Sequence, residues 1–252
     1  EGEIRAGCVR IPAELVDTKA VELLGLAGID PASLPDLAAM QPGTTNLVEE
    51  GLSDWQLARL GLITGSNFHR VTFDRSGSGL GVAAETYMYE ILGEWLTGVP
   101  ASNFDGNAAT AWGVKYEPEA IALYEKKTRR KVQRGKFFRM PGSQLIGCTP
   151  DGVGRGWGLE IKCPYTPKMH IRTLLSGQVP EEYRDQVNGH MLVTGKGKCD
   201  FVSYDPRMKD EKNRMVIVTV HRDETALARL EKRLRLMEDT VLTHLSRWAI
   251  NP

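Results

Sequence analysis

The stretch Ile146–Pro164 constrains the fold more than any other part of the chain, because glycines separate two short apolar runs within it. Gln144–Thr149 and Trp157–Lys162 each predict a strand, and the glycines at 152, 154, 156 and 158 are typical of a turn. We therefore expect the two runs to pair as the arms of a hairpin.

Three charged residues lie on this predicted hairpin: Asp151, Glu160 and Lys162. Side chains alternate along a strand, so Glu160 and Lys162 share one face while Leu159 and Ile161 take the other. We expect the face with Glu160 and Lys162 to be the one exposed to water.

Two carboxylates and a lysine at the rim of a sheet suit a hard cation, because Mg²⁺ takes a few carboxylate oxygens and keeps several waters. The lysine could orient a water, lower the pKa of that water, or stabilise charge on a phosphate. This combination suits phosphodiester hydrolysis. The alternative is a solvated hairpin with a surface ion pair, worth roughly 0–1 kcal/mol.

Composition limits the classes of protein open to this chain. With 252 residues, 41% of them hydrophobic, it can bury one large core, with or without a terminal elaboration. It has no long apolar run and no basic and apolar leader at its start, so we expect a soluble protein that is not exported. The four cysteines form no C-x-x-C pair, which argues against a zinc site or a disulfide framework and favours a reducing cytoplasm.

The net charge gives no signal for nucleic acid, because 32 Lys and Arg balance 32 Asp and Glu. Positive charge is concentrated locally, since Lys126–Arg139 contains eight cations and no anion. This run fits either a solvated helix end followed by an edge strand or the wall of a channel that follows a DNA backbone.

The first third of the chain contains a possible phosphate site. Residues 1–50 predict an N-terminal extension, with a helix at Pro12–Leu26 and a proline-rich connection, to which we assign no chemistry. A short helix is predicted at Leu52–Gly61, and a second helix begins at Thr64 or Ser66. Hydroxyls and free N–H groups at a helix start bind phosphate, and Arg59 lies just before them. Ordinary N-capping is the alternative for these hydroxyls.

One carboxylate interrupts the apolar face of a predicted helix. Gly81–Thr97 predicts a core helix, and Ala111–Thr128 predicts the next, with Glu117 on the same face as Ala120, Ile121 and Tyr124. A carboxylate there is costly to bury unless it is paired or binds a cation. The alternative is a Glu117 that reaches the helix edge or pairs with Lys115 or Lys126.

The remaining elements complete a mixed α/β pattern. Val132–Met140 predicts a strand, residues 198–205 and 214–221 predict two more, and an amphipathic helix closes the chain. Pro180–Thr194 predicts a helix with Gln186 and His190 facing inward, where Gln186 could hold a metal-bound water or a phosphate oxygen. A histidine on such a face is more typical of a core residue, so we assign His190 no ligand role. We expect a central mixed sheet flanked by helices.

Six blocks in one order, between Leu52 and Met208, carry a family resemblance: L-A-R-L-G-L-I-T-G-S, A-W-G-V-K-Y-E, C-T-P-D-G, G-L-E-I-K-C-P, Y-R-D-Q-V and Y-D-P-R-M. With these blocks the chain resembles the phage lambda exonuclease family, the YqaJ-type viral recombinases of the PD-(D/E)xK nuclease superfamily. The resemblance implies a restriction-endonuclease-like core over residues 51–252.

The resemblance also implies roles for individual residues. Asp151, Glu160 and the main-chain carbonyl of Ile161 would bind Mg²⁺, with Mn²⁺ as a substitute, and Lys162 would act on the attacking water. Glu117 and Gln186 would complete the catalytic site. The pocket for a terminal 5′-phosphate would be formed by Arg59, Thr64 and Ser66.

The implied activity is a 5′ to 3′ exonuclease that digests one strand of double-stranded DNA to mononucleotides and leaves a 3′ overhang for phage recombination. The resemblance also implies a homotrimeric ring and a single-strand annealing protein as partner. It further implies no association with a membrane and a place in the cytoplasm of a bacterial host. The alternatives are an endonuclease of the same fold and a catalytically inactive DNA-binding recombination module.

Overall fold

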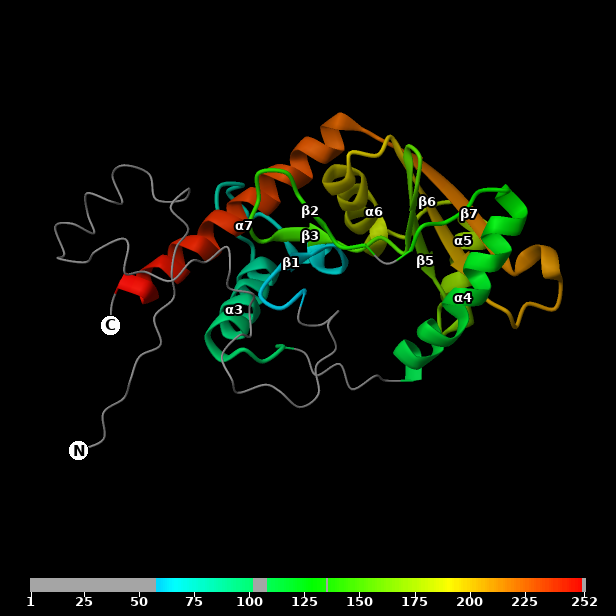
Figure 1. The fold of residues 1–252 in the computed structure, drawn as a ribbon, viewed down its shortest axis with the longest axis horizontal. Coiled ribbons are helices and arrows are strands. Elements are labelled where there is room, and N and C mark those ends of the chain that lie inside the picture. The colour runs from blue at the N-terminus through cyan, green and yellow to red at the C-terminus, as the bar shows by residue number, and fades with distance from the viewer. Residues whose placement is uncertain (1–57, 102–107, 135, 251–252) are drawn as a thin grey trace. The chain divides into compact units, whose positions relative to one another are not determined.

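The computed structural model describes residues 58–101, 108–134 and 136–250 (Figure 1). These residues fall into two compact units, the larger comprising 62–87 and the described residues from 108 to 238, and the smaller 58–61, 88–101 and 239–250. The helix predicted at Pro12–Leu26, the boundary predicted at residue 50 and most of the helix predicted at Leu52–Gly61 lie outside the described residues. No described helix is both long and apolar enough to cross a membrane.

The larger unit contains two sheets (Figure 1). In the first, β3 (Ile146–Cys148) lies between a parallel β1 (Ile63–Thr64) and an antiparallel β2 (Phe138–Arg139). The second has the order β4-β5-β6-β7, with β4 (Gly152–Gly154), β5 (Trp157–Lys162), β6 (Lys198–Tyr204) and β7 (Met215–His221). The mixed α/β class predicted from the sequence is confirmed, with two mixed sheets where one was expected.

The parallel pair β5 and β6 requires a crossover, because parallel strands cannot be joined by a tight turn. Two helices provide it, α5 (Pro167–Ser176) and α6 (Glu181–Thr194). The sequence predicted α6 almost to the residue, but α5 was not predicted. β6 and β7 are antiparallel neighbours, and the turn between them contains the short helix η4 (Glu211–Asn213).

One of the two strands predicted for the hairpin around Asp151 is wrong. β5 forms as predicted, but its antiparallel partner is β4, whereas Ile146–Cys148 belongs to the other sheet. β4 was interpreted as a turn because two of its three residues are glycines. Both glycines are required by packing, since a Cβ on Gly152 would lie 2.2 Å from Val132 Cγ1 and one on Gly154 would lie 2.2 Å from Trp157 Cε2.

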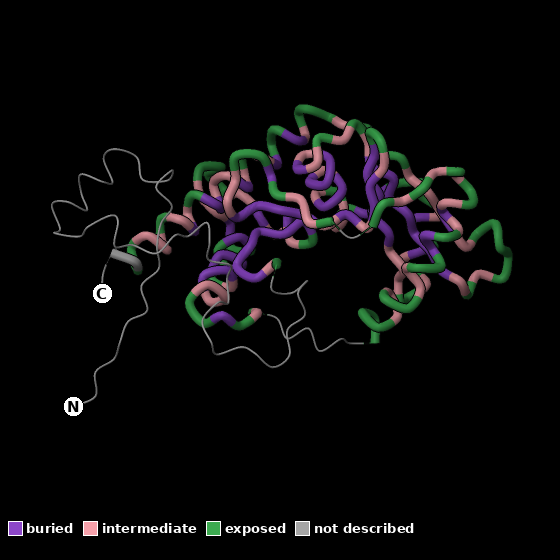
Figure 2. The backbone as a smooth tube through the Cα atoms, viewed as in Figure 1, coloured by how far each residue is buried: buried purple, intermediate pink, exposed green. Residues whose placement is uncertain are grey.

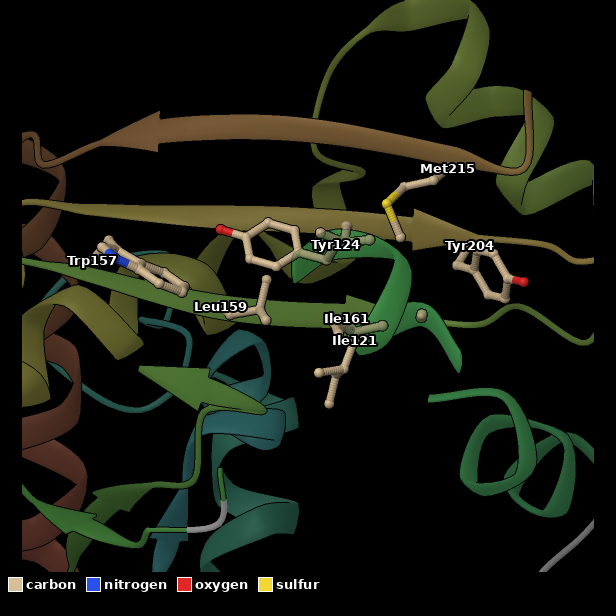
Figure 3. Close-up of a cluster of buried hydrophobic side chains, with 9 residues drawn as sticks. Ile121, Tyr124, Trp157, Leu159, Ile161, Tyr204 and Met215 are labelled. Carbon is tan, nitrogen blue, oxygen red and sulfur yellow. The ribbon is translucent and has the colours of Figure 1, made fainter. Parts of the chain in front are cut away.

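Both faces of β5 are covered by helices. Leu159 and Ile161 pack with α4 (Ala108–Thr128) in a buried cluster (Figure 3), whose members are Ala120, Ile121, Tyr124, Trp157, Leu159, Ile161, Val202, Tyr204 and Met215. On the opposite face, Phe201 of β6 packs with Val187 and Met191 of α6. β5 and β6 are therefore buried along nearly their whole length (Figure 2). The expectation that Glu160 faces water is wrong, because its side chain is only 1% exposed.

A buried carboxylate anchors α4 to the sheet. Asp200 of β6 accepts hydrogen bonds from the Tyr124 hydroxyl, the Arg130 guanidinium and the Thr219 hydroxyl, each at 2.6 Å. Burial, followed by the hydrogen bond to Asp200, raises the pKa of Tyr124 above its ordinary value. Because both oxygens of Asp200 have donors, this buried acid is fully accounted for by the fold.

The other predicted helices form with small changes of length. α3 is Val82–Thr97, α7 is Glu224–Ile250, and the 3₁₀ helix η3 is Gly65–Arg70. Of the stripe predicted for α3, Ala84, Tyr87, Met88, Ile91 and Leu92 are buried, whereas Trp95 is half-buried. The α7 residues Leu227, Leu230, Leu234, Met237 and Val241 are buried as well. Trp248, which continues the apolar spacing of α7 in the sequence, is 47% exposed. The strand predicted at Val132–Met140 is reduced to β2 and an isolated bridge between Gln133 and Val153.

Gly189 permits the close approach of α6 and η3, since a Cβ at this position would lie 2.2 Å from Cδ2 of the Phe68 ring. We expect Gly189→Ala to lower the free energy of unfolding by about 1–3 kcal/mol, as overpacking does. Gly113→Ala in α4 is the matched control, because nothing lies within 4 Å of its Cβ, and it should stabilise the protein by about 0.5–1 kcal/mol. Urea unfolding of both variants measures the difference, and equal effects would contradict the packing described here.

Candidate active site

The register of the β4–β5 hairpin brings Asp151 opposite Glu160. Gly152 pairs with Leu159 and Val153 with Gly158, so Asp151, which immediately precedes β4, faces the next residue along β5. Asp151 Oδ2 accepts a hydrogen bond from the backbone N–H of Ile161 at 2.5 Å. Two of the predicted metal ligands and the backbone of the third are therefore brought together by one hairpin.

Glu160 and Lys162 form an ion pair on the same face of β5. Glu160 Oε1 lies 2.6 Å from Lys162 Nζ, and the Lys162 side chain is 27% exposed. The ammonium group also lies 5.0 Å from the centre of the Tyr183 ring on α6. Glu160 Oε2 accepts no hydrogen bond from any described residue.

The charges of these three residues are coupled. Burial raises the pKa of Asp151 well above its ordinary value, and the negative charge of Glu160 adds to this, whereas Lys162 and the Ile161 N–H act in the opposite direction. Burial alone would lower the pKa of Lys162, but Glu160 and then Asp151 raise it above its usual range. Two carboxylates thus share one lysine, so the cluster favours an additional positive charge.

The donor set fits a hard divalent cation that keeps part of its water. In the described part of the chain, no three His, Cys, Asp or Glu side chains gather closely enough to hold a metal by themselves. Mg²⁺ does not need such a cage, because one or two carboxylates and several waters suffice. The buried oxygen of Glu160 that lacks a hydrogen bond is the atom a cation would satisfy.

Glu117 and Gln186 approach this region from two helices. Glu117 lies on α4 with its side chain 32% exposed, and its Oε1 accepts from Arg134 Nη2 at 2.7 Å, so its ion pair involves neither Lys115 nor Lys126. Its negative charge contributes to the raised pKa of Asp151. Gln186 is buried on α6, as its position on the apolar stripe predicted. Catalytic roles for both residues remain predictions.

His190 enters the site although the sequence argued against a role for it. It lies one turn after Gln186 on the same face of α6, and its Nδ1 is 3.4 Å from Glu160 Oε2. Both side chains are 1% exposed. The signal in the sequence was the spacing of four residues between two inward-facing polar side chains, which puts them on one helical face.

The predicted phosphate pocket is described only in part. Thr64 occupies the N-cap position of η3. Its Oγ1 lies 3.5 Å from Ser66 Oγ and accepts a hydrogen bond from Asn67 Nδ2 at 3.3 Å. Its backbone N–H donates to the Tyr87 hydroxyl at 3.0 Å. Arg59 belongs to the smaller unit, so its grouping with Thr64 and Ser66 remains a prediction.

The cation-rich run lies at the surface. Seven of its eight Lys and Arg side chains are exposed: Lys126, Lys127, Arg129, Lys131, Arg134, Lys136 and Arg139. Arg130 instead pairs with the buried Asp200. Exposure keeps most of this charge available to a polyanion, which is compatible with a DNA-facing wall.

Comparisons with known proteins show the family and the fold of the chain. Residues 54–197 match the model of the YqaJ-like viral recombinase domain. The structure is similar to that of an alkaline exonuclease from Laribacter hongkongensis, with 31% sequence identity and a TM-score of 0.68 over 77% of this chain and 96% of that one. The complex of the Laribacter exonuclease with dAMP matches at 30% identity and a TM-score of 0.67, over 76% of this chain and 93% of that one.

A third structure shares the fold alone. A phage-related exonuclease from Haemophilus somnus 129PT is 15% identical, with a TM-score of 0.60 over 74% of this chain and 96% of that one. Comparison with curated proteins finds no match. The fold is therefore that of known exonucleases, as the sequence blocks predicted.

The ion pair between Glu160 and Lys162 also gives a prediction for stability. Removing one partner leaves a buried charge uncompensated, so Lys162→Met should lower the free energy of unfolding in metal-free buffer by about 3 kcal/mol. The double variant Glu160→Gln with Lys162→Met should recover part of this loss, because it removes both charges. Urea denaturation of the single and double variants tests the coupling, and strictly additive losses would show that the pair is not coupled.

Proposed function

Because the chain belongs to the YqaJ-like viral recombinase domain family, we propose that it is a Mg²⁺-dependent nuclease of recombination that degrades one strand of double-stranded DNA from a 5′ end. The observation that carries the proposal is the cluster of Asp151, Glu160 and Lys162 on one hairpin, with one buried Glu160 oxygen lacking a hydrogen bond. The likeness to alkaline exonucleases supports the nuclease class.

In this proposal Asp151, Glu160 and the main-chain carbonyl of Ile161 hold Mg²⁺, or Mn²⁺ in its place. A metal held there would supply Lewis-acid chemistry, lowering the pKa of a water and stabilising charge at the scissile phosphate. Lys162 orients the attacking water, and its contact with Glu160 keeps its ammonium group on the metal-binding face of β5.

Gln186 and Glu117 complete the site in the same proposal. The amide of Gln186 projects from a helix that covers the Glu160 face and binds a water or a phosphate oxygen. Glu117 adds negative charge near Asp151, which supports the binding of a cation. Neither residue acts as a nucleophile.

Recognition of the DNA end is assigned to Arg59, Thr64 and Ser66, which bind the terminal 5′-phosphate. With the end fixed, hydrolysis releases mononucleotides and leaves a 3′ overhang. The complex of a 30% identical exonuclease with dAMP supports a mononucleotide product.

The proposed partners follow from this activity. The overhang is the substrate of a single-strand annealing protein, and a homotrimeric ring encloses the duplex. In such a ring the exposed cations of residues 126–139 follow the DNA backbone, so processivity depends on enclosure more than on tight binding. We place the protein with phage DNA in the cytoplasm of a bacterial host.

Digestion of a linear duplex tests the activity and its polarity. With Mg²⁺, a label at the 5′ terminus should be released early as a mononucleotide, a label at the 3′ terminus should persist, and a covalently closed circle should remain intact. EDTA should abolish release. Cutting of the circle would identify an endonuclease of the same fold, and DNA binding without any product would identify an inactive recombination module.

A single atom change tests the assignment of the site. Asp151→Asn keeps the shape of the side chain but removes a charged metal ligand, so the rate of hydrolysis should fall by more than about a hundredfold. This loss exceeds the one expected when a residue that only hydrogen-bonds to a metal ligand is replaced. Asp210→Asn is the control, because Asp210 is exposed, caps η4 through Lys212 N, and Asn caps helices equally well. Wild-type activity in Asp151→Asn would refute the site.

A further inference from the structure

The two oxygens of the Glu160 carboxylate have different surroundings. Oε1 lies 2.6 Å from Lys162 Nζ, whereas Oε2 faces His190 Nδ1 at 3.4 Å. The side chains of Glu160 and His190 are each 1% exposed, so bulk water does not separate them. Lys162 and His190 therefore face different oxygens of the same carboxylate, Lys162 from the strand that bears it and His190 from the helix that covers it.

Packing fixes the place of the imidazole ring. α6 packs against η3 and β5, and Gly189, next to His190, approaches the Phe68 ring closely enough that a Cβ would clash with it. On the far side of the ring, a Cβ on Gly65 would lie 3.3 Å from His190 Nε2. The ring is thus enclosed between the Gly65 backbone and Glu160, and it has little room to turn away from the carboxylate.

The chemistry of the pair favours a donor at Nδ1. A carboxylate oxygen only accepts hydrogen bonds, so the tautomer with the proton on Nδ1 is the favourable one beside Glu160. Carboxylates that bind metals are themselves held by hydrogen-bond donors, and loss of such a donor typically costs 10–100-fold in metal affinity or activity. No described residue donates a hydrogen bond to Glu160 Oε2 in the observed geometry, and His190 Nδ1 faces this oxygen at 3.4 Å.

We propose that His190 is a positioning residue that fixes the plane of the Glu160 carboxylate for metal binding, with Nδ1–H facing one lone pair of Oε2 and the other lone pair of Oε2 left for the cation, while Lys162 pairs with Oε1. This inference rests on the proposed metal-dependent function. His190 acts through Glu160 and touches neither metal nor DNA in this role. The proposal assigns a role to His190, the inward-facing polar residue one turn after Gln186, which the sequence pattern alone did not indicate.

Calorimetric titration of the 252-residue protein with Mn²⁺ tests the role directly. His190→Leu, which removes the donor, should weaken Mn²⁺ binding by about 10–100-fold. His190→Asn, whose amide can place a donor near the position of Nδ1, should lose clearly less. At saturating Mn²⁺ the kcat of both variants should recover most of its value, so the defect appears in the metal concentration required.

Met191→Ala is the matched control for damage to the same helix. Met191 follows His190, is fully buried, and belongs to the cluster around Phe201 on the sheet side of α6. This variant should lower the melting temperature while leaving the Mn²⁺ dissociation constant unchanged, which separates loss of packing from loss of positioning.

The outcomes distinguish this inference from the proposed function. Wild-type protein that binds no Mn²⁺ would overturn both. Wild-type protein that binds Mn²⁺ together with a His190→Leu variant of equal affinity would overturn the inference alone. If His190→Leu does not fold, the comparison of His190→Asn with Met191→Ala decides. Equal losses of Mn²⁺ affinity in these two variants would then overturn the inference.

Discussion

The burial of the Glu160 carboxylate is the constraint on which the rest of the site depends. β5 is covered by α4 on one face and by α6 on the other, so a charged side chain in its middle is kept from water. Such a charge is strongly destabilising unless it is paired. The fold supplies Lys162 for one oxygen and leaves the other without a hydrogen bond, facing His190. The atoms that determine whether the fold tolerates this buried charge are therefore the same atoms that would bind a cation.

A second buried acid in the same sheet shows why this matters. Asp200 lies on the neighbouring strand and is equally buried, but Tyr124, Arg130 and Thr219 all donate to it. That network gives each oxygen of Asp200 at least one donor, and it ties α4 to the sheet. Burial alone would not separate a structural carboxylate from a functional one. Asp200 accepts three hydrogen bonds, whereas Oε2 of Glu160 accepts none from the described residues, and this difference supports the proposal that Glu160 and not Asp200 binds a cation.

The sequence predicted elements whose signal is local and missed features that depend on distant partners. β5 and α6 were predicted almost to the residue, because each has an unbroken period of its own. The β4 arm was missed because Gly152 and Gly154 resemble a turn, and only Val132 and Trp157, which pack against them, explain the glycines. The burial of Glu160 was missed for the same reason, since α6 lies more than twenty residues further along the chain. The predicted grouping of Asp151, Glu160 and Lys162 on one hairpin is confirmed, while their catalytic roles stay predictions.

The packing of α6 links the two parts of the proposed function. The helix carries Gln186 and His190 on the face that covers β5, the strand proposed to bind metal. Through Gly189 it packs on Phe68 of η3, which begins directly after Thr64. Thr64 and Ser66, two of the residues proposed to hold the terminal phosphate, and the α6 residues proposed to act at the scissile bond thus lie on segments in direct contact. Protein interiors are close-packed and deform little. A fixed spacing between end recognition and hydrolysis would then follow from this contact, and it would set the length of each cleavage step.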